Sequence, residues 1–178
     1  MSCNLALTLF DSGIVQFGQF ASPNGIAPMR LDLMMLASYA AANSLLAQAC
    51  ARHLQLDDDT HRLCCSLDTL PVGLMIGQIL QQPVIYTPSR EYEAPREFIG
   101  AYDIGHPTVL LWSWPKQLCP DEWKEQMSRV GLQLCQVLYI VGGQNSVLPL
   151  CNLLNCLVAA HRIKPPQAAA CLRWFEAS

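Results

Sequence analysis

Basic side chains are scarce in this sequence. Of its 178 residues only three are lysines, Lys116, Lys124 and Lys164, and the formal net charge is −3. Proteins that bind nucleic acids obtain much of their affinity by neutralising phosphates with clustered lysine and arginine side chains. The composition therefore excludes a nucleic acid as the expected partner.

Charged residues of either sign are also few, at 14%, whereas 52% of the residues are apolar. This composition excludes a disordered chain, which needs low hydrophobicity and high charge. No Ser/Gly-rich or charge-blocked linker divides the sequence, and its length suffices for one sizeable core. We therefore expect a single domain over residues 1–178. The apolar excess also indicates that a protein partner covers part of the surface.

The nine cysteines lack the spacing of a metal site. No C-x-x-C occurs, and the one short pair, Cys151 and Cys156, has no second pair at zinc-ribbon spacing. Most lie among leucine, valine and alanine, where a free thiol behaves as a small hydrophobic group. We expect reduced, buried thiols and a cytoplasmic location. The nine positions are Cys3, Cys50, Cys64, Cys65, Cys119, Cys135, Cys151, Cys156 and Cys171.

Targeting and membrane signals are absent from the sequence as well. No basic segment followed by an apolar run stands at the start, which argues against a secretory signal. Residues 33–51 are long enough to cross a bilayer but are interrupted by Asn43 and Gln48, and residues 147–160 are too short. Both stretches are typical of core helices, so we expect no transmembrane segment.

Catalytic motifs are equally sparse. His53, His61, His106 and His161 show no metal-ligand spacing, and neither G-x-S-x-G nor a P-loop occurs. No nucleophile has a base nearby in the sequence. We expect no catalytic residue, no metal site and no cofactor.

Helical and extended segments alternate along the chain with short connections. Helices are expected at residues 5–11, 38–53, 73–82, 121–130, 146–160 and 166–176, with Ser38 as the N-cap of the second. Strands are expected at residues 15–21, 26–33, 62–67, 84–87, 108–114 and 136–141. This order predicts an α/β fold, with a mostly parallel sheet flanked by helices and a small N-terminal hood of about residues 1–36.

The opening of the chain carries a recognisable order of motifs. It contains Phe17-Gly18-Gln19-Phe20, then Asn24-Gly25, then Ala27-Pro28-Met29-Arg30-Leu31-Asp32-Leu33, and then Ser38-Tyr39. In order and spacing this resembles the opening of the orotate phosphoribosyltransferases, which have a phosphoribosyltransferase-type sheet and hood. Two positions differ, because Pro23 replaces the usual lysine and Met34 replaces a frequent arginine. The resemblance implies a ligand-facing position for Arg30.

Two loops depart further from that family. Residues 66–73 stand where the family has a glycine-rich loop that binds pyrophosphate, but they keep one glycine and insert Pro71, which removes a backbone donor. Residues 88–98 match the family's mobile loop. They hold Arg90 and Arg96, without the family's lysine and histidine, among three glutamates. Arg90 and Arg96 therefore stay only as degenerate ligand-binding positions, implied by the resemblance.

The end of the strand at residues 108–114 departs most. There the family has paired acidic residues and a Thr-Thr-Gly turn that hold the ribose 5-phosphate, whereas this chain has Trp112-Ser113-Trp114-Pro115. This stretch has no carboxylate and no glycine. Trp112, Trp114 and Pro115 are expected either to fill the former pocket or to form an aromatic surface for a partner.

These observations favour a non-catalytic relative of the orotate phosphoribosyltransferases that acts as a binding, assembly or regulatory factor. The alternative is an active orotate phosphoribosyltransferase, or a nucleotide- or orotate-binding protein, with a displaced phosphate site. The family's enzymes are homodimers, so the resemblance implies either a homodimer or a heteromer with a protein partner.

Overall fold

The computed structural model describes residues 2–22, 25–54, 61–114 and 120–177. Its helices are α1 (Ser2–Asp11), α2 (Ala40–His53), α3 (Leu70–Leu80), α4 (Pro120–Arg129), α5 (Leu150–Ala159) and α6 (Pro165–Glu176), with a 3-10 helix η1 at Leu33–Ser38. Its strands are β1 (Val15–Ser22), β2 (Gly25–Leu31), β3 (Arg62–Cys65), β4 (Val84–Tyr86), β5 (Pro107–Trp112), β6 (Gln133–Tyr139), β7 (Val141–Gly142) and β8 (Leu148–Pro149).

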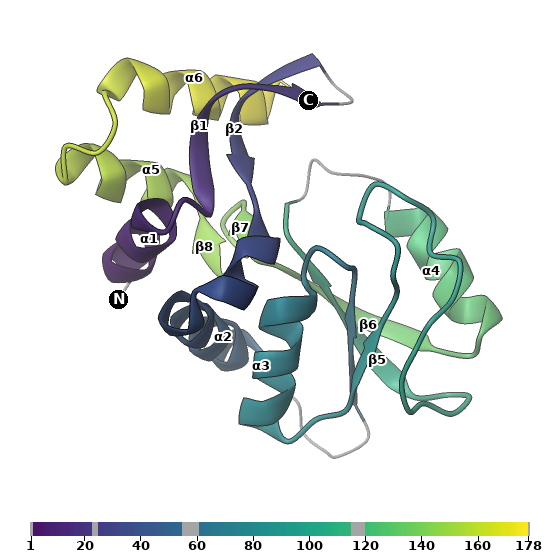
Figure 1. The fold of residues 1–178 in the computed structure, drawn as a ribbon. Helices are drawn as coiled ribbons and strands as arrows, with labels where there is room; N and C mark the ends of the chain where they lie inside the picture. The colour runs from purple at the N-terminus through teal and green to yellow at the C-terminus, as the bar shows by residue number, and fades with distance from the viewer. Residues whose placement is uncertain (1, 23–24, 55–60, 115–119, 178) are drawn as a thin grey trace.

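A parallel four-stranded sheet in the order β4-β3-β5-β6 forms the centre of the α/β fold, as expected (Figure 1). Both of its faces are covered, which is why β5 is apolar from Val109 to Trp112. Val109 and Leu111 belong to the large core under α2 and α3, whereas Leu110 and Trp112 belong to a smaller cluster under α4. Because the strands are parallel, their carboxyl ends meet along one edge of the sheet.

Helix α3 lies unusually close to the sheet. A Cβ atom at Gly73 would collide with the Cys65 sulfur on β3, and one at Gly77 would collide with Val84 on β4. The helix begins at Leu70, three residues earlier than expected, so Pro71 lies in its first turn rather than in a loop. Proline is tolerated there because the first N–H groups of a helix have no partner within the helix.

Three other helix starts differ from the prediction, and the first is α1, which begins at Ser2 rather than at residue 5. Ser38 closes η1 and does not cap α2, because Tyr39, with the non-helical angles φ −120° and ψ 74°, separates the two helices and α2 begins at Ala40. Helix α5 begins at Leu150 rather than at residue 146, because Leu148–Pro149 pair as β8 with β7. Pro149 has the extended backbone of an N-cap residue, with φ −55° and ψ 133°.

The hood is an antiparallel hairpin of β1 and β2 that stands beside the carboxyl edge of the sheet (Figure 1). Helix α6 packs against β2, and α1 packs against α5, so both ends of the chain meet here. A disulfide joins Cys3 of α1 to Cys156 of α5. The expectation of reduced, buried thiols throughout is therefore wrong for this pair, and Cys135 is exposed, whereas Cys50, Cys64, Cys65 and Cys171 are free and buried. None of the helices in the described ranges combines the length and apolar character needed to cross a membrane.

Candidate functional site

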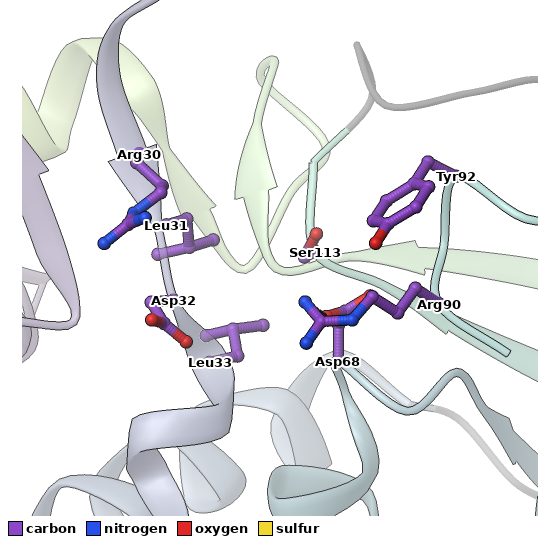
Figure 2. A pocket seen from close by; sticks show the side chains of 8 residues that line it. All are labelled: Arg30, Leu31, Asp32, Leu33, Asp68, Arg90, Tyr92 and Ser113. Atoms are coloured by element: carbon purple, nitrogen blue, oxygen red, sulfur yellow. Dashed lines mark hydrogen bonds and ion pairs between the residues drawn. The ribbon is translucent and has the colours of Figure 1, made fainter. Parts of the chain in front are cut away.

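A cavity of about 210 Å³ separates the hood from the carboxyl edge of the sheet. One wall is the end of β2 and the start of η1, and the other is built from segments that follow β3, β4 and β5 (Figure 2). Crevices at the carboxyl ends of parallel strands are the usual ligand sites of α/β proteins. The lining residues are Arg30, Leu31, Asp32, Leu33, Asp68, Arg90, Tyr92 and Ser113.

On the hood wall, Leu31 and Leu33 point toward the opposite side, whereas the Arg30 guanidinium turns away from Arg90 (Figure 2). The Arg30 guanidinium donates to Gln16 Oε1 at 2.7 Å and lies 5.0 Å from the centre of the Phe20 ring. Arg30 is thus held by the hairpin itself, through a hydrogen bond and a cation–π contact. Asp32 completes this wall.

On the sheet wall, Arg90 and Asp68 form an ion pair, with Arg90 Nη1 3.4 Å from Asp68 Oδ1. The other Asp68 oxygen accepts a hydrogen bond of 3.0 Å from the backbone N–H of Glu91. Asp68 follows β3 and Arg90 follows β4, so the pair ties together the ends of two neighbouring strands. The cation of Arg90 is already partly neutralised by the protein.

Glu91 is the most unusual group near the cavity. Its side chain is buried, with the residue only 1% exposed, and its carboxyl contacts Ser113 at the end of β5. The backbone N–H of Ser113 donates to Glu91 Oε1 at 2.7 Å, and the Ser113 hydroxyl forms a short hydrogen bond with Glu91 Oε2. Both donors of Ser113 are therefore directed at this one side chain.

Burial raises the pKa of the Glu91 carboxyl to about 8, because a charged carboxylate loses its hydration in the interior. The hydrogen bonds from Ser113 oppose this effect, and the nearby Asp68 carboxylate adds to it. At neutral pH the carboxyl is mostly protonated. In that form one oxygen accepts from the Ser113 N–H, and the other stays hydrogen-bonded to the Ser113 hydroxyl.

The loop between β3 and α3 is closed on itself. The backbone N–H of Ser66 donates to Thr69 Oγ1 at 3.1 Å, and that of Thr69 donates to Ser66 Oγ at 3.2 Å. The N–H of Leu67 donates to the Ser89 carbonyl at 3.0 Å. These three backbone donors are used within the protein and do not face the cavity as an anion-binding row.

Arg96, the third arginine expected at a ligand-binding position, lies elsewhere. It lines an open depression with Glu93, Ala94, Pro95 and Gln126, between the loop and α4. The structure thus brings Arg30 and Arg90 to the two walls of one cavity and leaves Arg96 outside it.

The two tryptophans at the end of β5 are core residues, and neither lines the cavity. Trp112 is fully buried and meets Trp123 of α4 edge to face, with ring centres 5.1 Å apart. Trp114 is 5% exposed and meets Phe175 of α6 at 5.5 Å. Pro115, the third residue of this prediction, lies outside the described residues.

The sequence did not identify four residues near the cavity as site residues, namely Asp68, Glu91, Tyr92 and Ser113. Asp68 and Ser113 do carry a signal, because each follows a buried strand and the carboxyl ends of parallel strands converge. Glu91 carries none, because it is one of three glutamates in a loop whose charges nearly cancel. Across the described ranges, no three histidine, cysteine, aspartate or glutamate side chains gather as a metal site.

No protein-family model and no curated protein matches the chain. Several solved structures are similar to it. UMP synthase of Leishmania donovani has a TM-score of 0.81 at 22% identity over 99% of this chain, which spans 42% of that protein. The orotate phosphoribosyltransferases of Aeropyrum pernix (TM-score 0.66, 19% identity, 86% of this chain and 98% of that one) and Francisella tularensis (0.64, 12%, 96% and 93%) are similar along nearly their whole length. The chain therefore has the fold of the orotate phosphoribosyltransferases, the type I phosphoribosyltransferase fold.

Proposed function

We propose that this protein is a non-catalytic relative of the orotate phosphoribosyltransferases that acts as a binding, assembly or regulatory factor through contacts with other protein chains. The observation that carries the proposal is the contact of the Glu91 side chain, from the loop after β4, with Ser113 at the end of β5. This side chain takes both donors of Ser113, at the strand end where the resembling enzymes hold a 5-phosphate.

The charges around the cavity support the same proposal. A magnesium-bound polyphosphate needs concentrated positive charge to offset its oxygens in a site that excludes water. Here two arginines are accompanied by Asp32 and Asp68, and Arg90 is paired with Asp68. In the loop of residues 66–69, the backbone N–H groups of Ser66, Leu67 and Thr69 already donate hydrogen bonds to acceptors within the protein. Little positive potential is left for a pyrophosphate.

Contacts with another chain are supported by the outer face of α3. This helix has no charged residue, and Leu74 and Ile79 on it are 50% and 42% exposed. Gln78 is the one polar side chain of this helix, and a helix this rich in apolar residues is usually covered on more than one side. We propose that a second copy or a different protein chain covers this face, giving the homodimer or heteromer expected from the sequence.

One observation favours the alternative of a retained small-molecule site. The cavity is not closed, and Arg30 and Arg90 stand on its two walls. A nucleotide or orotate that entered it without a phosphate cradle would be bound and not converted. Binding and turnover must therefore be measured separately.

The test incubates the purified protein with phosphoribosyl pyrophosphate, magnesium and orotate, and follows orotidine monophosphate. We expect no product above the rate without protein. The positive control is the same mixture with a small amount of an active orotate phosphoribosyltransferase added, which shows that the assay detects product. Product formation that scales with the amount of this protein overturns the proposal. Saturable binding of orotidine monophosphate by calorimetry without turnover supports the alternative binding role.

A further inference from the structure

Residues 88–98 form a strap that crosses the carboxyl edge of the sheet and returns to its starting point. Its two ends meet, because the N–H and carbonyl of Tyr86 pair with those of Ile99 at 2.9 and 2.8 Å. Between these ends the strap is fixed at a few points. Ser89 accepts from Leu67, and the carbonyl of Glu93 accepts from the indole N–H of Trp123 at 3.2 Å.

Glu91 differs from the other charged residues of the strap. Arg90, Glu93, Arg96 and Glu97 are exposed, whereas Glu91 is 1% exposed and reaches the end of β5. It is held in both directions, because its backbone N–H donates to Asp68 and its carboxyl contacts Ser113. A long polar side chain is rarely this buried in the absence of a specific role.

We propose that the contact between Glu91 and Ser113 is a proton-dependent latch that keeps the strap folded over the cavity, and that ionisation of Glu91 releases the strap.

The surroundings of Glu91 explain why its charged form is disfavoured. On the side of β3 it faces the Asp68 carboxylate and the Cys65 thiol, and the pKa of that thiol is itself raised by burial. Hydrogen bonds with the uncharged Ser66 and Ser113 lower the pKa of Glu91, but they offset the loss of hydration only in part. Arg90, its neighbour on the strap, directs its guanidinium to Asp68, and no ion pair in the described ranges includes Glu91. An ionised Glu91 is thus a buried charge beside another carboxylate.

The sign of the pH dependence follows from the raised pKa of about 8. A released Glu91 is in water and titrates near the ordinary pKa of glutamate, about 4.3. The docked state therefore holds an extra proton between these two values. The latch is fully effective below the lower value, weakens as the pH rises, and reaches its weakest level above about pH 8.

Release of the strap would change the cavity directly. Arg90 and Tyr92 of the strap form part of its wall, and the two groups that hold Glu91, Asp68 and Ser113, line it as well. When Glu91 withdraws, the wall formed by Arg90 and Tyr92 moves with it, and both Ser113 donors face the open cavity. A group that entered the cavity would then find hydrogen-bond donors that the docked strap conceals.

Hydrogen exchange measured by mass spectrometry tests the latch in the 178-residue chain without any ligand. In the wild type, protection of the peptide covering the strap, corrected for intrinsic exchange, should fall by up to about tenfold per pH unit between pH 5 and about pH 8 and then level off. In Glu91→Gln the amide keeps both contacts with Ser113 but cannot ionise, so protection should not change with pH. Glu97→Gln, an exposed glutamate of the same strap, should behave as the wild type.

A second variant separates titration from simple packing. Asp68→Asn removes the neighbouring negative charge and so lowers the pKa of Glu91. The protection of the strap peptide should therefore stop falling at a lower pH than it does in the wild type. Equal pH profiles for the wild type and Glu91→Gln overturn the latch, as does an unchanged profile in Asp68→Asn. If Glu91→Gln does not fold, the shift in Asp68→Asn decides alone. Exchange is measured without substrate, so the result is independent of whether the protein is catalytic.

Discussion

Three neighbouring side chains at the end of β5 lie in three different environments: Trp112, Ser113 and Trp114. Trp112 packs under α4, Trp114 packs against α6, and Ser113 between them lines the cavity. The sequence predicted that large aromatic rings stand at this strand end, and the structure places both of them in the core. It did not indicate that the rings belong to two separate clusters, because the positions of α4 and α6 depend on contacts distant in the sequence.

The burial of the two rings predicts large effects on stability. Trp112→Ala and Trp114→Ala should each lower the free energy of unfolding by about 3–5 kcal/mol, because each removes a buried ring and leaves a cavity. Trp112→Phe and Trp114→Phe keep much of the packing and should cost less. Denaturant-induced unfolding measures all four. Wild-type stability of Trp114→Ala together with a lost protein partner would show instead that this ring forms a binding surface.

Among the elements, strands β3, β4 and β5 were the most predictable, whereas β7 and β8 were not predicted and several helix starts were misplaced. The short apolar runs bounded by polar residues predicted β3, β4 and β5 within a few residues. Helix starts failed at α2, α3 and α5, where a 3-10 turn, an early proline and a two-residue strand decide the boundary. Each of these depends on tertiary pairing or on a local backbone choice that hydrophobic periodicity does not encode.

Helix α3 gives the prediction that belongs to this scale. If another chain covers its outer face, the double variant Leu74→Lys/Ile79→Lys should reduce the molar mass of the complex to that of a single chain, or abolish recovery of the partner. Two buried charges without counter-ions disrupt an apolar interface. Light scattering during size exclusion at micromolar concentration measures the mass.

The matched control is Ile104→Lys. Ile104 is 89% exposed and lies in the turn before β5, at the opposite edge of the sheet from the cavity. It should leave the association unchanged. A wild-type protein that elutes as a monomer and recovers no partner from native lysate contradicts an interface on α3.

At the scale of the whole molecule, the hood is held by both ends of the chain. Helix α1 and the hairpin come from the first residues, whereas α5 and α6 come from the last (Figure 1). The cavity lies between the hairpin and the carboxyl edge of the sheet. The sequence predicted the hairpin from its own residues but not the contribution of the C-terminal helices. The Cys3–Cys156 disulfide, with a sequence separation of 153, links the two ends covalently.

This disulfide should make the stability of the whole fold depend on redox conditions. Closing so long a loop restricts the unfolded chain, which on the chain-entropy model stabilises the folded state by up to about 5 kcal/mol. Under oxidising conditions Cys3→Ser should therefore unfold at a lower denaturant concentration than the wild type. In dithiothreitol the two proteins should unfold together, because the reduced wild type lacks the Cys3–Cys156 link just as the variant does. Cys135→Ser, which removes an exposed free thiol, should match the wild type in both conditions. A Cys3→Ser variant as stable as the oxidised wild type would show that the hood is held by packing, with no measurable contribution from the covalent link.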